Sequence, residues 1–176
     1  MSARTVLHQA DISRALTRIA HEILESNRGA DDLVLLGIPT RGVTLAHRLA
    51  QLVGDIAQTS VAVGALDVTL FRDDLSKHPT RSPRPTEIPA GGVDGKTVVL
   101  VDDVLFSGRS IRAALDAIQS IGRPAVVRLA ILVDRGHREL PIRPDFIGKN
   151  IPSARTERVN VRLQETDGAE EVTIGE

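Results

Sequence analysis

The stretch that runs from Val98 to Ser110 constrains the fold of this chain more than any other. It opens with an aliphatic run, Val98-Val99-Leu100-Val101, which predicts a fully buried strand. Two acids, Asp102 and Asp103, follow the run, and a short loop of mainly small residues leads into apolar residues at helical spacing from 111 to 121. A buried strand joined by a short loop to a helix is the repeating unit of a parallel α/β sheet.

The same stretch predicts a seat for a sugar phosphate. The start of the helix would present unpaired backbone N–H groups and the positive end of the helix dipole, and both attract a phosphate. The carboxylates of Asp102 and Asp103 would repel that phosphate, and they suit sugar hydroxyls or a divalent cation a few ångströms away. A ribose phosphate is the simplest ligand that fits both halves.

Other segments repeat this order of strand, loop and helix. Residues 33–38, 60–70 and 125–133 predict further strands of the same sheet. The first of them leads through Thr40-Arg41-Gly42 into a helix over 43–53, so this loop is either a second anion site or an ordinary turn. The carboxyl ends of the strands would share one edge, where open α/β sheets bind their ligands.

The first helix is predicted to follow Asp11, which would be its N-cap, and to end before Gly29. Its polar face is either solvated or a contact surface. Beyond Pro144, apolar and polar residues alternate on both sides of an Asp-Gly turn, which predicts a small antiparallel hairpin.

The predicted architecture is therefore α/β, with a parallel core, helices on both faces and this hairpin as a hood over about residues 145–176. A chain of 176 residues is most simply a single domain, over 1–176.

A long segment without a core of its own precedes the strand that carries the two acids. Residues 76–95 hold four prolines and three glycines. A connection of this length is uncommon in a compact domain unless it is functional or disordered. We therefore predict a flexible lid over about residues 72–95 that closes over the site.

The composition excludes several classes of protein. The absence of cysteine excludes a disulfide framework and a thiolate metal site, and no apolar run suggests a secretory signal or a membrane span, so we expect a cytoplasmic protein without membrane contact. With three Phe and no Tyr or Trp, the chain has little to stack on single-stranded nucleic acid. The net charge is −1, yet residues 135–162 hold seven basic and three acidic residues, which predicts a local basic face.

Several strings identify the chain by resemblance. Residues 102–110 resemble the motif with which type I phosphoribosyltransferases bind 5-phosphoribosyl-1-diphosphate (PRPP). Four longer strings resemble the bacterial PyrR family, whose members are pyrimidine operon regulators and also uracil phosphoribosyltransferases; they are RALTRIAHE (14–22), DVTLFRDDLS (67–76), LVDRGHRELPIR (132–143) and IGKNIP (147–152). The resemblance runs from about residue 10 to the C-terminus and implies the type I phosphoribosyltransferase fold.

The resemblance also implies a reaction and its residues. Uracil and PRPP would give UMP and diphosphate, with Mg²⁺ carried mainly by PRPP and water and with Asp102 and Asp103 nearby. The catalytic residues would be Arg41, Arg72, Asp102 and Asp103. The residues that bind PRPP and its phosphates would be Thr40, Arg41, Gly42, Asp102, Asp103, Leu105, Phe106, Ser107, Gly108, Arg109 and Ser110. Val133 and Asp134 would bind the base, largely through the main chain.

A second activity follows from the same resemblance. The chain would bind the leader mRNA of pyr operons when UMP or UTP is present, through Thr17, His21, Arg138, Arg143 and Lys149. Ser26 stands where relatives often have an arginine, and the basic segment is otherwise a solvated or subunit-interface face. The family forms dimers and larger assemblies, so we expect a homodimer or a larger homo-oligomer.

Two positions distinguish the possible activities. Purine phosphoribosyltransferases carry an acid three positions after the second acid of the motif, and Phe106 stands there in this chain. A purine reaction would lack its general base, whereas uracil has a more acidic ring N–H and needs less help. Pro39 stands where many relatives have a lysine. Two alternatives therefore stay open: an RNA-binding nucleotide sensor with vestigial catalysis, and a plain phosphoribosyltransferase without an RNA role.

Overall fold

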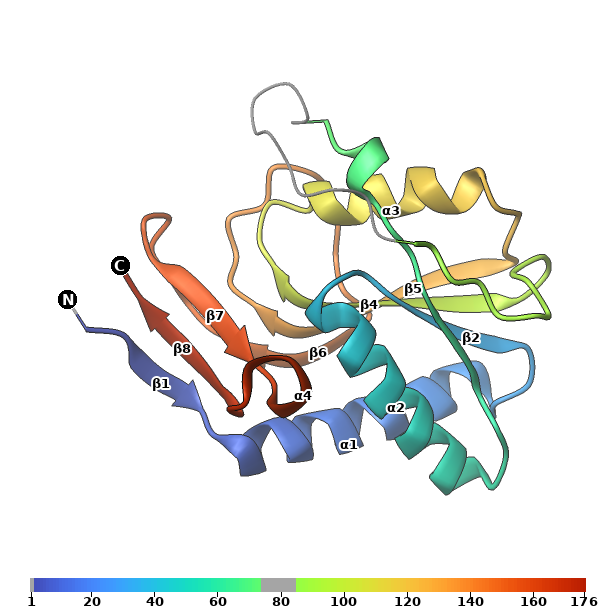
Figure 1. Ribbon diagram of the computed structural model, residues 1–176, viewed down its shortest axis with the longest axis horizontal. Helices are drawn as coiled ribbons and strands as arrows, with labels where there is room; N and C mark the ends of the chain where they lie inside the picture. The colour runs from blue at the N-terminus through green and yellow to red at the C-terminus, as the bar shows by residue number, and fades with distance from the viewer. Residues whose placement is uncertain (1, 74–84) are drawn as a thin grey trace.

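Two sheets and the helices that pack on them make up the fold (Figure 1). The computed structural model describes residues 2–73 and 85–176. The larger sheet has five parallel strands in the order β3-β2-β4-β5-β6; they are β2 (Leu33–Gly37), β3 (Ala62–Ala65), β4 (Thr97–Leu105), β5 (Val126–Asp134) and β6 (Phe146–Asn150). The predicted α/β fold with a parallel core is confirmed.

Helices cover both faces of the larger sheet (Figure 1). α1 (Gln9–Asn27) and α2 (Arg41–Ala57) lie on one face, and α3 (Arg109–Gln119) lies on the other. Successive residues of β4 point to opposite faces, so Val99 belongs to the core beneath α1 and α2, and Leu100 belongs to the core beneath α3. Because both faces are covered, the strand is an unbroken aliphatic run, as predicted.

The hood is an antiparallel sheet of three strands, β1-β8-β7. The predicted hairpin is confirmed as β7 (Arg158–Arg162) and β8 (Glu171–Gly175), joined by the short helix α4 (Gln164–Asp167). The third strand is β1 (Arg4–Leu7), which pairs with β8 and brings the two termini side by side (Figure 1). Antiparallel pairing starts later than the expected boundary near residue 145, because β6 belongs to the parallel sheet.

Two boundaries near the site differ from the prediction. The strand expected over 60–70 is only Ala62–Ala65, after which the chain leads into a 3₁₀ turn, η1 (Thr69–Phe71). α1 begins at Gln9, so Asp11 is not its N-cap. His8 is the N-cap, and the Asp11 carboxylate accepts a hydrogen bond from the His8 N–H at 2.9 Å, because an acid at the third helical position completes a capping box.

Part of the predicted lid packs against the sheet. Glu87 exchanges two backbone hydrogen bonds with Ala65 at the end of β3, of 2.8 and 2.9 Å, and Val93 is buried. Residues 74–84 of the predicted lid lie outside the described residues. Within the two described ranges, no helix has the length and apolar character needed to span a bilayer.

Candidate active site

Three segments that are distant in sequence meet at the carboxyl edge of the parallel sheet. The loop after β2, the segment around η1 and the end of β4 enclose a cavity of about 210 Å³. Six of the predicted site residues line it: Thr40, Arg41, Arg72, Asp102, Asp103 and Ser110. The structure therefore gathers the predicted diphosphate loop, the two acids and the start of α3 around one space.

The loop after β2 lies directly against β4. The Ile38 N–H donates to the Val101 carbonyl at 2.9 Å. A Cβ atom on Gly42 would lie only 2.5 Å from the Val101 carbonyl oxygen, so only glycine permits this approach. The first residues of α2 are thereby held close to the acids of β4.

β4 continues through the acid pair instead of ending before it. The Asp103 N–H donates to the Asp102 carboxylate, and the Val104 N–H donates to the Asp103 carboxylate, both at 2.8 Å. Each of these bonds ties down one carboxylate oxygen. The strand thus presents two oriented, half-buried carboxylates at the cavity.

The loop between β4 and α3 has the form expected of a phosphate seat. Gly108 is the N-cap of α3 and has a φ of 93°, which favours glycine. The Ser107 hydroxyl accepts from the Arg109 N–H at 3.2 Å, and the Ser107 carbonyl accepts from the Glu139 and Leu140 N–H groups at 2.9 and 3.2 Å. Leu105 is buried in the core, so its side chain supports this loop from below.

Arg109 is predicted to bind phosphate, but its side chain contacts two carboxylates instead. Its guanidinium donates to Asp73 at 2.6 Å and to Glu139 at 2.9 Å. These two carboxylates, Glu139 first, raise the pKa of Arg109. The side chain thus joins the segment after η1 to the loop after β5.

Phe106 forms a stacked cluster that sequence reasoning missed. The buried Arg135 guanidinium lies 4.3 Å from the centre of the Phe106 ring, and the His137 ring meets Phe106 edge-on at 5.7 Å. Arg135 also donates to the Ser153 hydroxyl and to the Ala154 carbonyl, at 3.1 and 2.8 Å. Burial lowers the pKa of Arg135. The cluster ties the loop between β4 and α3 to the segment after β6.

A second cavity of about 330 Å³ lies beside this cluster. Asp134, predicted to face the base, lines it, and its carboxylate accepts from the Gly136 N–H at 3.0 Å and from Arg138. Val133 is fully buried, so it can offer only its main chain. Three lining residues that were not predicted as site residues, Asn150, Ile151 and Pro152, stand in the string IGKNIP quoted above.

The predicted RNA residues fall into two groups. Thr17 and His21 are exposed on α1, and Lys149 is exposed on β6, which α1 packs beside. Arg18 ties these two elements together by donating to the carbonyls of Ile147 and Gly148, at 3.0 and 2.6 Å. The other two residues, Arg138 and Arg143, lie in the loop before β6.

Of this second pair, only Arg143 is exposed. The Arg138 guanidinium is turned inward. It donates to the carboxylate of Asp134 and to the carbonyls of Phe106 and Ile142, at 3.0 and 2.8 Å for the two carbonyls.

Comparison with known proteins agrees with this geometry. The phosphoribosyl transferase domain family matches residues 2–166. The chain has the fold of a hypoxanthine phosphoribosyltransferase from Trypanosoma cruzi in complex with IMP, with a TM-score of 0.73 and 16% identity over 98% of this chain and 93% of that one. A hypoxanthine-guanine phosphoribosyltransferase from Bacillus anthracis shares the fold with a TM-score of 0.72 and 13% identity over 98% of both chains.

Much more similar sequences carry one name, "Bifunctional protein PyrR". The protein of that name from Leifsonia xyli subsp. xyli is 67% identical over 100% of this chain and 98% of its own length. The one from Streptomyces coelicolor is 62% identical over 98% of this chain and 90% of its own length. With these full-length matches, and with the acid pair between two helix starts at one sheet edge, the chain belongs to the PyrR family of bifunctional proteins within the phosphoribosyl transferase domain family.

Proposed function

We propose that this protein transfers the phosphoribosyl group of PRPP to uracil and thereby forms UMP and diphosphate. The observation that carries the proposal is the pair of carboxylates on β4, which lines one cavity together with the starts of α2 and α3. PRPP has phosphate groups at both ends and hydroxyls between them. Two helix starts suit the phosphates, and carboxylates suit the hydroxyls.

The chain's own residues supply most of the electrostatics of this reaction. As the bond from C1 of ribose to diphosphate breaks, positive charge develops on the ribose and negative charge on the leaving diphosphate. Arg41 and Arg72 line the cavity and would stabilise the leaving group, while Asp102 and Asp103 would hold the hydroxyls. The bond from ribose C1 to the uracil nitrogen forms as the ring N–H gives its proton to the leaving diphosphate or to water. Phe106 offers no base at its position, which favours the more acidic uracil over a purine.

The residues at this cavity fit Mg²⁺ that arrives with its substrate. In residues 2–73 and 85–176, no group of three or more His, Cys, Asp or Glu side chains could hold a metal ion alone. Mg²⁺ commonly uses one or two carboxylates together with substrate phosphates and water, and Asp102 and Asp103 are such carboxylates. When bound, it would neutralise charge on the leaving diphosphate.

The enzymatic half of the proposal is tested by following UMP. Wild-type protein with uracil, PRPP and Mg²⁺ is expected to form UMP, and Asp103→Asn is expected to lower kcat/KM by about 100-fold because an oriented charge is lost. Asp55→Asn is the matched control, since Asp55 is exposed near the end of α2 and its carboxylate accepts a hydrogen bond from Gln51. Reaction of orotate or hypoxanthine without reaction of uracil would contradict the substrate assignment.

We further propose that the protein binds pyr leader mRNA when a uridine nucleotide fills the site. The full-length PyrR relatives support this, and so does the shared surface of α1 and β6 with Thr17, His21 and Lys149. Titration of labelled leader RNA with and without UMP tests it: the nucleotide should tighten binding. Equal affinity in both titrations would contradict nucleotide-dependent regulation, and tight RNA binding without turnover would favour a sensor with vestigial catalysis.

We also propose that the protein is cytoplasmic and forms a homo-oligomer. The sequence contains no cysteine, which supports the reducing environment of the cytoplasm. A homodimer or a larger homo-oligomer stays a prediction that sedimentation of the purified protein would test.

A further inference from the structure

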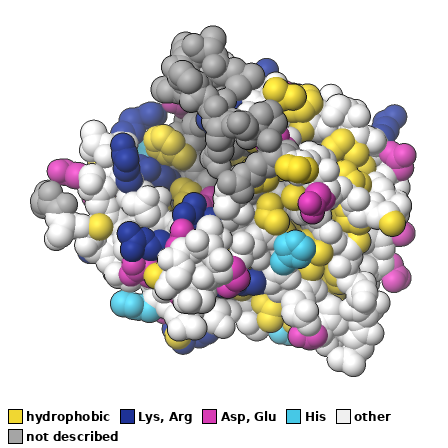
Figure 2. All heavy atoms as spheres, viewed as in Figure 1, with side chains coloured by type: hydrophobic (Ala, Val, Ile, Leu, Met, Phe, Trp, Pro, Cys, Tyr) yellow, Lys and Arg dark blue, Asp and Glu magenta, His cyan; other side chains and the backbone are white. Residues whose placement is uncertain are grey.

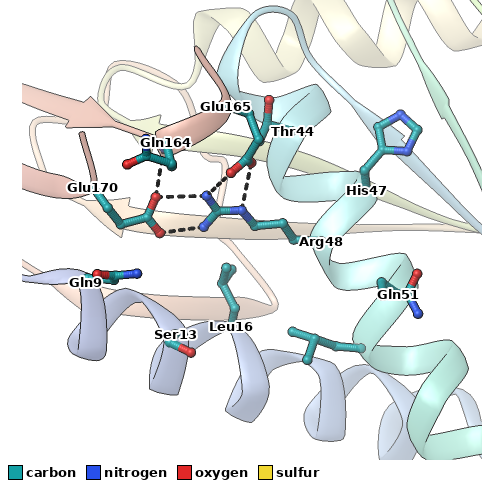
Figure 3. A pocket seen from close by; sticks show the side chains of 11 residues that line it. Gln9, Ser13, Leu16, Thr44, His47, Arg48, Gln51, Gln164, Glu165 and Glu170 are labelled. Carbon is teal, nitrogen blue, oxygen red and sulfur yellow. Dashed lines mark hydrogen bonds and ion pairs between the residues drawn. The ribbon is translucent and has the colours of Figure 1, made fainter. Parts of the chain in front are cut away.

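The turn between β7 and β8 contacts two arginines of α2 through three carboxylates, those of Glu165, Asp167 and Glu170. We call these three carboxylates the acidic clasp. Arg48 of α2 lies between Glu165 and Glu170 (Figure 3). Its guanidinium makes four hydrogen bonds to them, of 2.6 to 2.9 Å. Only 9% of the Glu170 side chain is exposed. Arg48 therefore anchors the turn firmly to α2.

The third carboxylate of the clasp reaches the active site. Asp167 accepts two hydrogen bonds from Arg41, from Nε at 3.1 Å and from Nη2 at 2.7 Å. The same carboxylate accepts from the Leu163 N–H at 2.8 Å, so its own turn fixes its orientation. The Arg41 guanidinium holds the pKa of Asp167 below its usual range. A hood residue thus determines where the first side chain of α2 lies.

This contact leaves the other end of Arg41 for a ligand. Asp167 occupies the edge made by Nε and Nη2, and within the part of the chain that the structure describes Nη1 has no partner. Arg41 also lines the active-site cavity. A loose arginine side chain loses rotamer entropy when an anion fixes it, and a side chain that is already held loses less.

Asp167 also competes with a carboxylate inside the site. The charge of Asp103 also acts on Arg41, although more weakly than the hydrogen bonds that Arg41 donates to Asp167. Without Asp167, Asp103 would be the carboxylate best placed to attract the guanidinium. Arg41 would then cover an acid that is needed for ribose hydroxyls and would turn away from the diphosphate.

We propose that Asp167 is a positioning residue for phosphoribosyl transfer, which holds Arg41 in the orientation that binds the diphosphate of PRPP. The inference rests on the proposed function, since Arg41 is assigned to diphosphate there. It adds a residue outside the catalytic motifs, from the hood, to the machinery of the site.

The test compares Asp167→Asn with a hood carboxylate that is remote from Arg41. Asp167→Asn should raise the Kd of PRPP, measured by calorimetric titration, and its KM by about tenfold, which is ~1.4 kcal/mol, and should leave the KM of uracil unchanged. Glu171→Gln removes the ion pair with Arg162 in the same sheet and should change neither KM. An unchanged or tighter Kd for PRPP in Asp167→Asn would overturn the proposal.

A double-mutant cycle separates positioning from a structural role. In an Arg41→Ala background, Asp167→Asn should weaken PRPP binding no further, whereas a hood that merely misfolds would weaken it again. Asp167→Glu keeps the charge and should recover at least half of the lost affinity. Because the titration needs no turnover, a protein that binds PRPP but forms no UMP still tests Asp167, and a wild type that binds no PRPP overturns both proposals.

Discussion

Arg138 connects the cavity beside Asp134 to the loop between β4 and α3. Its guanidinium donates to the Asp134 carboxylate and, at 3.0 Å, to the Phe106 carbonyl. Only 24% of its side chain is exposed. The resemblance to PyrR proteins predicts that Arg138 touches RNA, but these contacts give it a structural reason to affect the nucleotide first.

Arg138→Ala is therefore expected to weaken uracil and UMP binding as well as RNA binding. Loss of the donor leaves partly buried acceptors unpaired, which costs ~1–3 kcal/mol, so the KM of uracil should rise by about tenfold or more. Arg143→Ala, at an exposed position in the same loop, should weaken RNA binding and leave the KM of uracil unchanged. Steady-state kinetics and RNA titration of both variants check this. An unchanged KM of uracil in Arg138→Ala would contradict the inward role.

The contacts of the Phe106 ring could not be predicted from the sequence. The position of Phe106 where purine enzymes have an acid can be read from the sequence. The contact between Arg135 and this ring cannot be read from the sequence, because it depends on how β5 lies beside β4. An arginine after a strand is ordinarily exposed, and the Ser153 and Ala154 acceptors together with the Phe106 ring compensate for the burial of this one.

At the scale of elements, the clasp makes the stability of the hood depend on pH. Arg48 holds the pKa of Glu170 below its ordinary value of 4.5. A carboxylate with a lowered folded-state pKa stabilises the fold fully above its ordinary pKa, and this stabilisation is lost as the pH falls through the folded-state pKa. The hood should thus be most stable near neutral pH, and its stability should fall in acid below about pH 4.5.

Glu170→Gln removes this pH dependence along with the charge. We expect the variant to unfold several degrees below the wild type at pH 7, since ~1–2 kcal/mol of pairing corresponds to about 2–8 °C in a protein of this size. The difference should shrink as the pH is lowered from 5 to 3. Thermal scans over that range check it, with Glu165→Gln, whose carboxylate is half exposed, expected to show the smaller effect. A difference that stays constant with pH would contradict the ion-pair explanation.

Elements that are buried on both faces could be predicted from sequence, and those that depend on distant partners could not. The aliphatic run of β4 specifies a central strand locally, because covering helices leave no polar face. β1 has no such signal, since this strand of four residues forms by pairing with β8 from the other end of the chain. Asp11 is ambiguous for a local reason: an acid suits both the N-cap and the third helical position.

At the scale of the whole molecule, the site is an assembly of the sheet edge and the hood. Motifs predicted the residues at the ends of β2, β4 and β5, because parallel strands bring their carboxyl ends to one edge. The contact between Asp167 of α4 and Arg41 of α2 joins residues 126 positions apart, and no sequence pattern marks it. Local motifs thus predict residues that line one cavity, and a long-range contact orients the side chain of one of them, Arg41.

The charge of the whole molecule limits how it can hold RNA. The net charge is −1, and Figure 2 shows basic and acidic side chains interspersed over the side that carries the hood. RNA binding would therefore rest on a few local phosphate contacts. Each contact to a single strand contributes about −0.7 to the slope of log K against log salt concentration, so a slope near −2 to −3 is expected.

Lys149→Gln should reduce the magnitude of that slope by about 0.7, because it removes one cation from the surface of α1 and β6. Arg123→Gln is the matched control: Arg123 is exposed just before β5, at the opposite edge of the sheet from the cavity beside Asp134, and its loss should leave the slope unchanged. Titrations of leader RNA between 50 and 300 mM salt, with UMP present, measure both. Equal losses in the two variants would mean that the RNA responds to total charge, and the α1–β6 surface would then not be its binding site.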